Sequence, residues 1–155
     1  MAVIRYVDIR DSTEARVVLE LQRASYAVEA EITGSRELPP LFETLEELRF
    51  SGEDFHGYFL EDTLAGAVST KRRGSILDIH RLIVAPKYFR RGIASAMLRH
   101  VEGSGEWESI TVSTGSRNEP AKRLYLSHGF AEAGEDEVIP GLFVTRFEKG
   151  WRMGV

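Results

Sequence analysis

Residues 82–94 read Leu82-Ile83-Val84-Ala85-Pro86-Lys87-Tyr88-Phe89-Arg90-Arg91-Gly92-Ile93-Ala94. An apolar strand ends at a proline, a basic turn follows, and a glycine precedes an amphipathic helix. The first N–H groups of a helix lack partners within the helix, and the helix dipole adds partial positive charge there. Gly92 and the small Ala94 let a ligand approach this backbone closely, and two arginines add forked donors. The stretch predicts either a site for an anion such as a diphosphate or an ordinary basic helix start.

The segments on both sides of this stretch complete a mixed sheet. In chain order we expect a strand at 2–7, a helix that starts at the capping pair Asp11 and Glu14, a short helix capped by Thr44 and Glu47, strands at 55–60, 64–71 and 76–84, a helix at 92–102, a strand at 109–113, a helix at 119–127, and strands at 130–133 and 142–147. This β-α-α-β-β-β-α-β-α-β-β order predicts one α/β (α+β mixed sheet) domain over residues 1–155.

Composition excludes several classes of protein. The 155 residues include no cysteine, which rules out disulfides, thiolate nucleophiles and cysteine-ligated metals. The net charge of −4 argues against nucleic acid as the main partner. No run approaches the roughly 18 apolar residues of a membrane span, and the N-terminus does not read as a signal peptide. We therefore expect a cytoplasmic protein that binds no membrane, no nucleic acid and no metal.

A second informative stretch follows the first. Residues 117–130 read Arg117-Asn118-Glu119-Pro120-Ala121-Lys122-Arg123-Leu124-Tyr125-Leu126-Ser127-His128-Gly129-Phe130. Asn118 can cap a helix, Pro120 suits its first turn, and Gly129 can end it. Ala121 and Tyr125 lie one turn apart on the same helix face. Taken alone, the stretch predicts a capped helix that carries a buried aromatic residue.

Together the two stretches resemble the signature motifs of the GNAT acetyltransferases. In that family the motif (Gln/Arg)-x-x-Gly-x-(Gly/Ala) holds the diphosphate of CoA. It is matched here at Gly92 and Ala94 but not at its first position, which is Phe89. The second motif, Asn-x-x-Ala-x-x-x-Tyr-x-x-x-Gly-Phe, is matched at every defined position, namely Asn118, Ala121, Tyr125, Gly129 and Phe130. The resemblance extends over about residues 55–147 and implies the GNAT acyl-CoA N-acyltransferase fold.

The resemblance implies an acetyl-CoA-dependent N-acetyltransferase, in which a primary amine attacks the thioester directly within a ternary complex. In the family this strand, here residues 76–84, is splayed at a bulge that exposes backbone donors, so the N–H of Leu82 or Ile83 would polarise the acetyl carbonyl, and Val84 would pair with the pantetheine arm. Asn118 would hydrogen-bond that arm, and Lys122 or Arg123 would reach the 3′-phosphate. The implied CoA-binding residues are Leu82, Ile83, Val84, Arg90, Arg91, Gly92, Ile93, Ala94, Ser95, Asn118, Ala121, Lys122 and Tyr125.

The proton transfers need an acid for the leaving thiolate and a base for the acceptor amine. The pKa of such an amine is about 10. By resemblance, Tyr125 is the acid, with packing against pantetheine as its alternative role. Several residues compete for the role of base. Asp78 falls where some family members carry a catalytic glutamate, and His80 lies two residues on, on the same strand face unless a bulge intervenes. Glu29, Glu31 and a chain of water molecules remain open alternatives.

The charge of the chain is unevenly distributed. Acids far outnumber bases between Glu29 and Asp62, whereas residues 86–101 carry Lys and Arg and no acid. The acidic segment either forms a solvated face or borders an acceptor site, where Glu29 and Glu31 would bind a cationic small molecule or a lysine or N-terminal amine of a peptide. A non-catalytic acyl-CoA-binding or regulatory module is the alternative function. A homodimer is also compatible with the resemblance.

Overall fold

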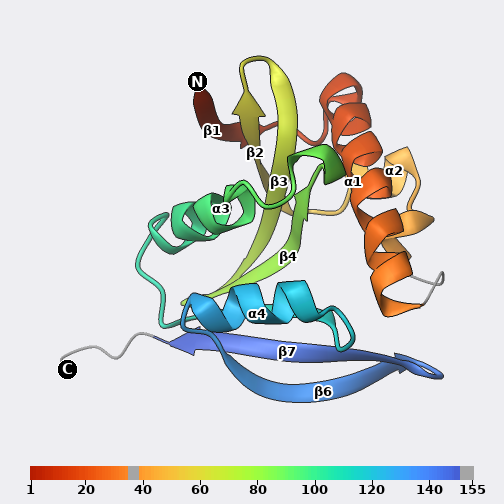
Figure 1. Ribbon diagram of the computed structural model, residues 1–155. Coiled ribbons are helices and arrows are strands. Elements are labelled where there is room, and N and C mark those ends of the chain that lie inside the picture. Colours follow the sequence, from red (N-terminus) through yellow and green to blue (C-terminus); the bar gives the residue numbers. More distant parts are fainter. Residues whose placement is uncertain (35–38, 151–155) are drawn as a thin grey trace.

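The computed structural model describes residues 1–34 and 39–150. Within them, seven strands form one sheet in the order β1-β2-β3-β4-β5-β7-β6 (Figure 1). The strands are β1 (Ala2–Val7), β2 (Asp54–Leu60), β3 (Thr63–Arg73), β4 (Ile76–Val84), β5 (Ser109–Gly115), β6 (Ala131–Ile139) and β7 (Leu142–Gly150). The helices are α1 (Ser12–Thr33), α2 (Leu45–Arg49), α3 (Ile93–Glu102) and α4 (Glu119–Ser127), with 3-10 turns η1 (Pro39–Leu41) and η2 (Pro86–Tyr88). The predicted element order is confirmed.

Local capping starts both N-terminal helices where the sequence predicts. The carboxylate of Asp11 accepts a hydrogen bond from the N–H of Glu14 at 2.9 Å. The carboxylate of Glu14 accepts from the N–H of Asp8 at 3.0 Å, so it does not complete a reciprocal box with Asp11. At α2, Thr44 and Glu47 form both halves of the predicted capping box. The start of α1 is therefore as predicted, and Glu14 additionally ties the residues before the helix to its first turn.

The two C-terminal strands extend beyond their predicted ends. Residues 134–139 continue β6, and residues 148–150 continue β7. Most of β6 is exposed on both faces, so its acidic residues show no alternation between polar and apolar positions. Because alternation reports one-sided burial, an exposed edge strand leaves no such signal in the sequence. No helix in the described ranges is long and apolar enough to cross a membrane.

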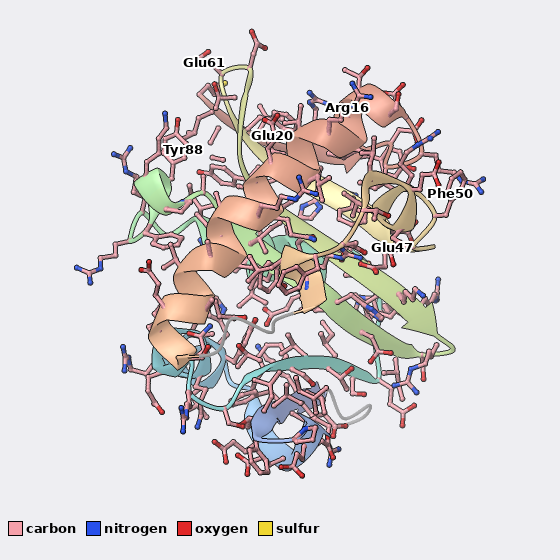
Figure 2. All side chains as sticks on the ribbon, turned by 90° about the vertical axis from the view of Figure 1, so that its right-hand side faces the viewer. Arg16, Glu20, Glu47, Phe50, Glu61 and Tyr88 are labelled. Atoms are coloured by element: carbon pink, nitrogen blue, oxygen red, sulfur yellow. The ribbon has the colours of Figure 1, made fainter. Side chains whose placement is uncertain are left out.

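Helix α1 covers one face of the sheet with a stripe of buried residues. Ala15 and Val18 are fully buried against strands β1 and β2, and the polar Gln22 continues the same stripe. Arg16 and Glu20 project outward from the opposite side of the helix (Figure 2). The buried position of a polar side chain within this stripe marks the place where α1 leaves the apolar core and meets a charged network.

Helices α3 and α4 cover the other face, where the larger apolar core lies (Figure 1). Met97 and Leu98 of α3 are fully buried there, and each contributes about 1.5–3 kcal/mol of hydrophobic stabilisation. Gly66 of β3 allows this close approach, because an added Cβ would lie 2.9 Å from the Cε of Met97. The N-terminus of α3 is thereby held close to the C-terminal end of β4.

Strands β4 and β5 pair in parallel only from Ile76 to Ile79 and then diverge. Near the divergence, β4 contains a bulge. Consecutive residues of β3, Ser69 and Thr70, pair with Arg81 and Ile79, which leaves His80 without a partner in β3. In β4 the side chains that face α3 are therefore Leu77 and Ile79 before the bulge, but Leu82 and Val84 after it. One edge of β4 is consequently open beyond the bulge.

Candidate active site

A cleft of about 950 Å³ occupies the space where β4 and β5 diverge. Its walls come from α1, the second half of β4, the loop before α3, the end of β5 and the first turns of α4. The motif residues Gly92, Ala94, Asn118, Ala121 and Tyr125 all line it. The two motifs that were far apart in the sequence therefore meet at one site.

The loop before α3 presents free backbone donors to this cleft. Arg90 and Gly92 both have left-handed backbone angles, with φ of 64° and 76°. Residues 90–95 show no backbone N–H donating to another described residue, whereas the N–H of Ala96 bonds the carbonyl of Gly92 at 3.0 Å. Tyr88 stands beside this loop on η2 (Figure 2), and the cations of Lys87 and Arg91 lie over its ring. The turn has the free amides and the charge that a diphosphate requires.

The open edge of β4 supplies a second set of backbone groups. The N–H of Ala85 bonds the carbonyl of Ala65 in β3 at 2.8 Å. Because hydrogen bonds alternate along an antiparallel ladder, the N–H groups of Val84 and Leu82 point away from β3, whereas that of Ile83 points toward it. An extended arm such as pantetheine could add to this edge as an extra strand. Of the two predicted carbonyl donors, Leu82 has the suitable direction.

Tyr125 lies at the base of the cleft with 4% of its surface exposed. Its ring packs against Phe130 and Phe147, with ring centroids 5.9 and 5.5 Å apart. Burial, followed by the neighbouring Tyr26 and then by the charge of Glu29, raises the pKa of its hydroxyl above the ordinary value. The hydroxyl is therefore protonated at neutral pH and can donate a proton.

Glu29 reaches the same region from α1. Its carboxylate accepts a hydrogen bond of 2.7 Å from the side-chain NH2 of Asn118. The side-chain oxygen of Asn118 in turn accepts from the backbone N–H of Ala121. Burial raises the pKa of Glu29, and the bond from Asn118 offsets this only in part. Asn118 thus holds a carboxylate of raised basicity beside the cleft, in addition to capping α4.

Arg81, which lines the cleft, is the centre of a charged network with residues from three other segments. Its guanidinium donates to Glu53 at 2.8 and 2.9 Å, to Gln22 at 2.7 Å and to both carboxylate oxygens of Glu43. Burial opposes ionisation of Glu53, but the bonds from Arg81 and Ser69 outweigh it and hold its pKa below the usual value. One guanidinium and two carboxylates leave a net negative charge beside the cleft.

The two residues predicted from β4 as possible bases differ in their access to the cleft. His80 borders the cleft and is exposed, with its Nδ1 3.9 Å from Oε2 of Glu53. Asp78 lines a separate groove, which His80 also borders, and is absent from the lining of the cleft. Hydrogen bonds from Arg73, at 2.5 Å, and from Thr111 hold the pKa of Asp78 below its usual value. Asp78 is therefore a weak base and is not brought together with Tyr125.

The other residues predicted to bind CoA or the acceptor also differ in whether they line the cleft. Leu82, Ile83, Val84, Arg90, Ile93 and Ser95 line the cleft with the motif residues. Arg91 and Lys122 are not among its lining residues, and Lys122 instead bonds the carbonyl of Ser116 at 3.2 Å. Glu31 is exposed and also lies away from the lining.

Sequence reasoning missed two features of the site. Tyr26 lines the cleft beside Glu29, and burial and that carboxylate raise its pKa. The Arg81 network was missed as well. A usable signal existed, because Gln22, Tyr26 and Glu29 follow one another at helical spacing on one face of α1. Polar residues in line with a buried stripe indicate a side that meets a functional site.

Comparisons with known proteins agree with this geometry. The model of the acetyltransferase (GNAT) family matches residues 16–130. The UPF0157 protein YqkA of Bacillus subtilis (strain 168) is 34% identical over 146 residues, which is 94% of this chain and 43% of that protein. The chain thus spans less than half the length of this relative.

Solved structures with low sequence identity share the fold. The ribosomal-protein-S18-alanine N-acetyltransferase from Escherichia coli is 16% identical, with a TM-score of 0.78 over 100% of this chain and 97% of that one. The PaiA N-acetyltransferase from Thermoplasma acidophilum, solved in complex with coenzyme A, is 18% identical, with a TM-score of 0.74 over 97% and 99% of the two chains. Because the family model covers most of the chain, the chain belongs to the acetyltransferase (GNAT) family.

Proposed function

We propose that the protein transfers the acetyl group of acetyl-CoA to a primary amine of a cationic acceptor, by direct attack within a ternary complex. One observation carries the proposal: a single cleft combines the free amides of residues 90–95, the open edge of β4, and the side chains of Glu29 and Tyr125. The amides and the edge fit a diphosphate and an extended arm. When bound, acetyl-CoA would supply the thioester carbonyl that the amine attacks.

The backbone of this chain would position the reacting groups. Free amides at the start of α3 hold the diphosphate, and Val84 pairs with the arm along the edge of β4. The N–H of Leu82 points into the gap between β4 and β5, where it donates to the acetyl carbonyl as negative charge develops on its oxygen. Holding both reactants in one cleft removes most of the entropic cost of their encounter.

Two side chains would move the protons. Glu29, with its raised pKa, takes the proton from the acceptor ammonium, directly or through one water molecule. Tyr125, which its burial keeps protonated, donates its hydroxyl proton to the departing sulfur. The second proton, which the nitrogen loses as the amide forms, returns to the oxygen of Tyr125, directly or through water. His80 is the second candidate base, because it is exposed at the border of the cleft. The negative charge of Glu29 and of the Arg81 network favours an acceptor that arrives as a cation.

Thiol release with a panel of amines tests this function. Acetyl-CoA and CoA should raise the melting temperature, whereas NAD and ATP should not, because only ligands of the folded state stabilise it. We expect Tyr125→Phe to lower kcat by about 10²-fold with little change in CoA affinity. An equal loss of turnover and affinity would remove Tyr125 from the role of acid. Stabilisation by CoA without turnover of any amine would instead support the non-catalytic module.

A further inference from the structure

The side chain of His128, which follows α4, hydrogen-bonds a residue of the active-site cleft. Its imidazole Nε2 lies 3.0 Å from Oγ of Ser95, in the first turn of α3. Ser95 lines the cleft, whereas His128 is absent from its lining. The bond therefore connects α3, whose first turn contributes free amides, to the end of the helix that carries Tyr125.

The backbone around His128 fixes where the imidazole lies. The N–H of His128 closes α4 with bonds to the carbonyls of Leu124 and Tyr125 at 3.2 and 3.1 Å. Gly129 then turns the chain with a φ of 84°, and the N–H of Phe130 bonds the carbonyl of Tyr125 at 3.0 Å. The Cα of His128 is thus held by the same turn that packs the ring of Phe130 against that of Tyr125.

Ser95 is placed to touch an anion at the start of α3. It is the third residue of that helix, and the Cα–Cβ bonds of a helix tilt toward its N-terminus, so its hydroxyl lies on the side of the free amides. Gly92, which caps α3, has no side chain to bond them. A serine hydroxyl in a helix can also turn to a carbonyl of the preceding turn, which takes its proton away from a ligand. The bond with His128 offers the hydroxyl a partner other than that carbonyl.

The direction of the bond between Ser95 and His128 depends on which atom carries the proton. If Ser95 donates to an unprotonated Nε2, its single proton is used and only oxygen lone pairs face the cleft. If the Nε2–H of His128 donates to Oγ, the hydroxyl proton is free for another acceptor. An ionised diphosphate accepts hydrogen bonds and donates none, so it fits only the second arrangement. A diphosphate in the cleft therefore selects His128 with a proton on Nε2.

We propose that His128 is a positioning residue for the donor substrate: its Nε2–H donates to Oγ of Ser95 and so directs the hydroxyl proton of Ser95 at the diphosphate of acetyl-CoA. The inference rests on the proposed function and adds to it a residue from outside the cleft. Hydrogen bonds in such a chain polarise one another, by about 10–30% per bond, so the imidazole also strengthens the contact that Ser95 makes. His128 acts through Ser95 alone and moves no proton to or from the acetyl group.

Calorimetric titration with CoA tests the pair as a double-mutant cycle. Ser95→Ala should raise the Kd for CoA about 10-fold, because a hydrogen bond to a charged group is lost, and His128→Leu about 3- to 5-fold. In the Ser95→Ala protein, His128→Leu should add nothing, whereas independent effects would multiply. His128→Gln keeps a side-chain N–H donor and should bind CoA within about 2-fold of the wild type. Multiplying effects, or a His128→Gln variant as weak as His128→Leu, would overturn the inference.

Three comparisons separate positioning from a structural role. Pantetheine lacks the diphosphate, so its Kd should be the same for the wild type and His128→Leu. In steady-state kinetics, His128→Leu should raise the KM for acetyl-CoA and leave kcat unchanged, whereas a displaced α4 would carry Tyr125 with it and lower kcat. His100→Leu removes an imidazole from the last turn of α3, outside the cleft lining, and should leave the Kd for CoA unchanged.

The same titrations distinguish this inference from the proposed function. If the wild type and His128→Leu bind CoA equally tightly, the role of His128 fails and the proposed function stands. If His128→Leu weakens CoA binding as expected while no amine is acetylated, the role of His128 stands and the enzymatic proposal fails. A wild type that binds no CoA would refute both.

Discussion

Replacing Arg81 by Met should destabilise the protein more than any other removal of a single charge described above. The substitution leaves the mostly buried side chains of Glu43 and Glu53 without their common partner. Removal of one member of a buried ion pair costs about 3–5 kcal/mol, because the remaining charge keeps its desolvation penalty. For a domain of this size, that loss corresponds to a fall in Tm of about 6–20 °C. Urea unfolding measures the loss directly, provided that the slope m is unchanged.

Two controls separate charge burial from loss of side-chain volume. Arg146→Met removes an exposed pair with Asp136, and it should cost less than about 1 kcal/mol. A triple variant with Arg81→Met, Glu43→Leu and Glu53→Leu removes the whole network and should recover much of the stability lost in Arg81→Met. If Arg81→Met proved as mild as Arg146→Met, or the triple variant were the least stable, the network would not be the buried ionic unit described here.

Two further predictions concern the cleft. Glu29→Gln should lower kcat by about 10²-fold or more and abolish the acid limb of its pH profile, which the raised pKa of Glu29 places above the ordinary range of a glutamate. Because a carboxylate with a raised pKa destabilises the fold once it is ionised, the same variant should be at least as stable as the wild type at neutral pH. An acid limb that persists in Glu29→Gln would exclude Glu29 as the base. Gly92→Ala and Gly74→Ala both place a side chain on a left-handed backbone, with φ of 76° and 61°. Each should lower the free energy of unfolding by about 1–2 kcal/mol. Only Gly92→Ala should also weaken CoA binding, measured by calorimetry. Equal CoA affinity in both variants would show that the turn is not part of the CoA site.

Features that depend on nearby residues were predictable from the sequence. The caps at Asp11 and Thr44, the ends of α4 and the two motifs are all set by residues within one or two turns. Their meeting in one cleft followed from the family resemblance, and the structure adds the direction of the backbone groups. Physical periodicity could also have separated Glu29 from Glu31, because only Glu29 shares a helix face with Gln22 and Tyr26.

Features that depend on pairing between distant segments were not predictable. The family resemblance implied a bulge in β4, but its position at His80 depends on how β3 pairs with β4, and no residue type in β4 indicates that position. The environment of Asp78 in β4 depends on Arg73 of β3 and Thr111 of β5. The Arg81 network likewise joins residues from four separate segments. Single-sequence reasoning therefore identified the residue types of the site more reliably than their partners.

The anchoring of Arg81 has a consequence for how ligands enter. Strand β4 beyond its bulge is held toward α1 by the guanidinium, and β5 is held toward β7 along its whole length. Beyond Ile79, β4 and β5 are thus kept from pairing with each other before any ligand arrives. Binding then requires little reorganisation of the sheet, which favours fast association and leaves more of the contact energy for affinity.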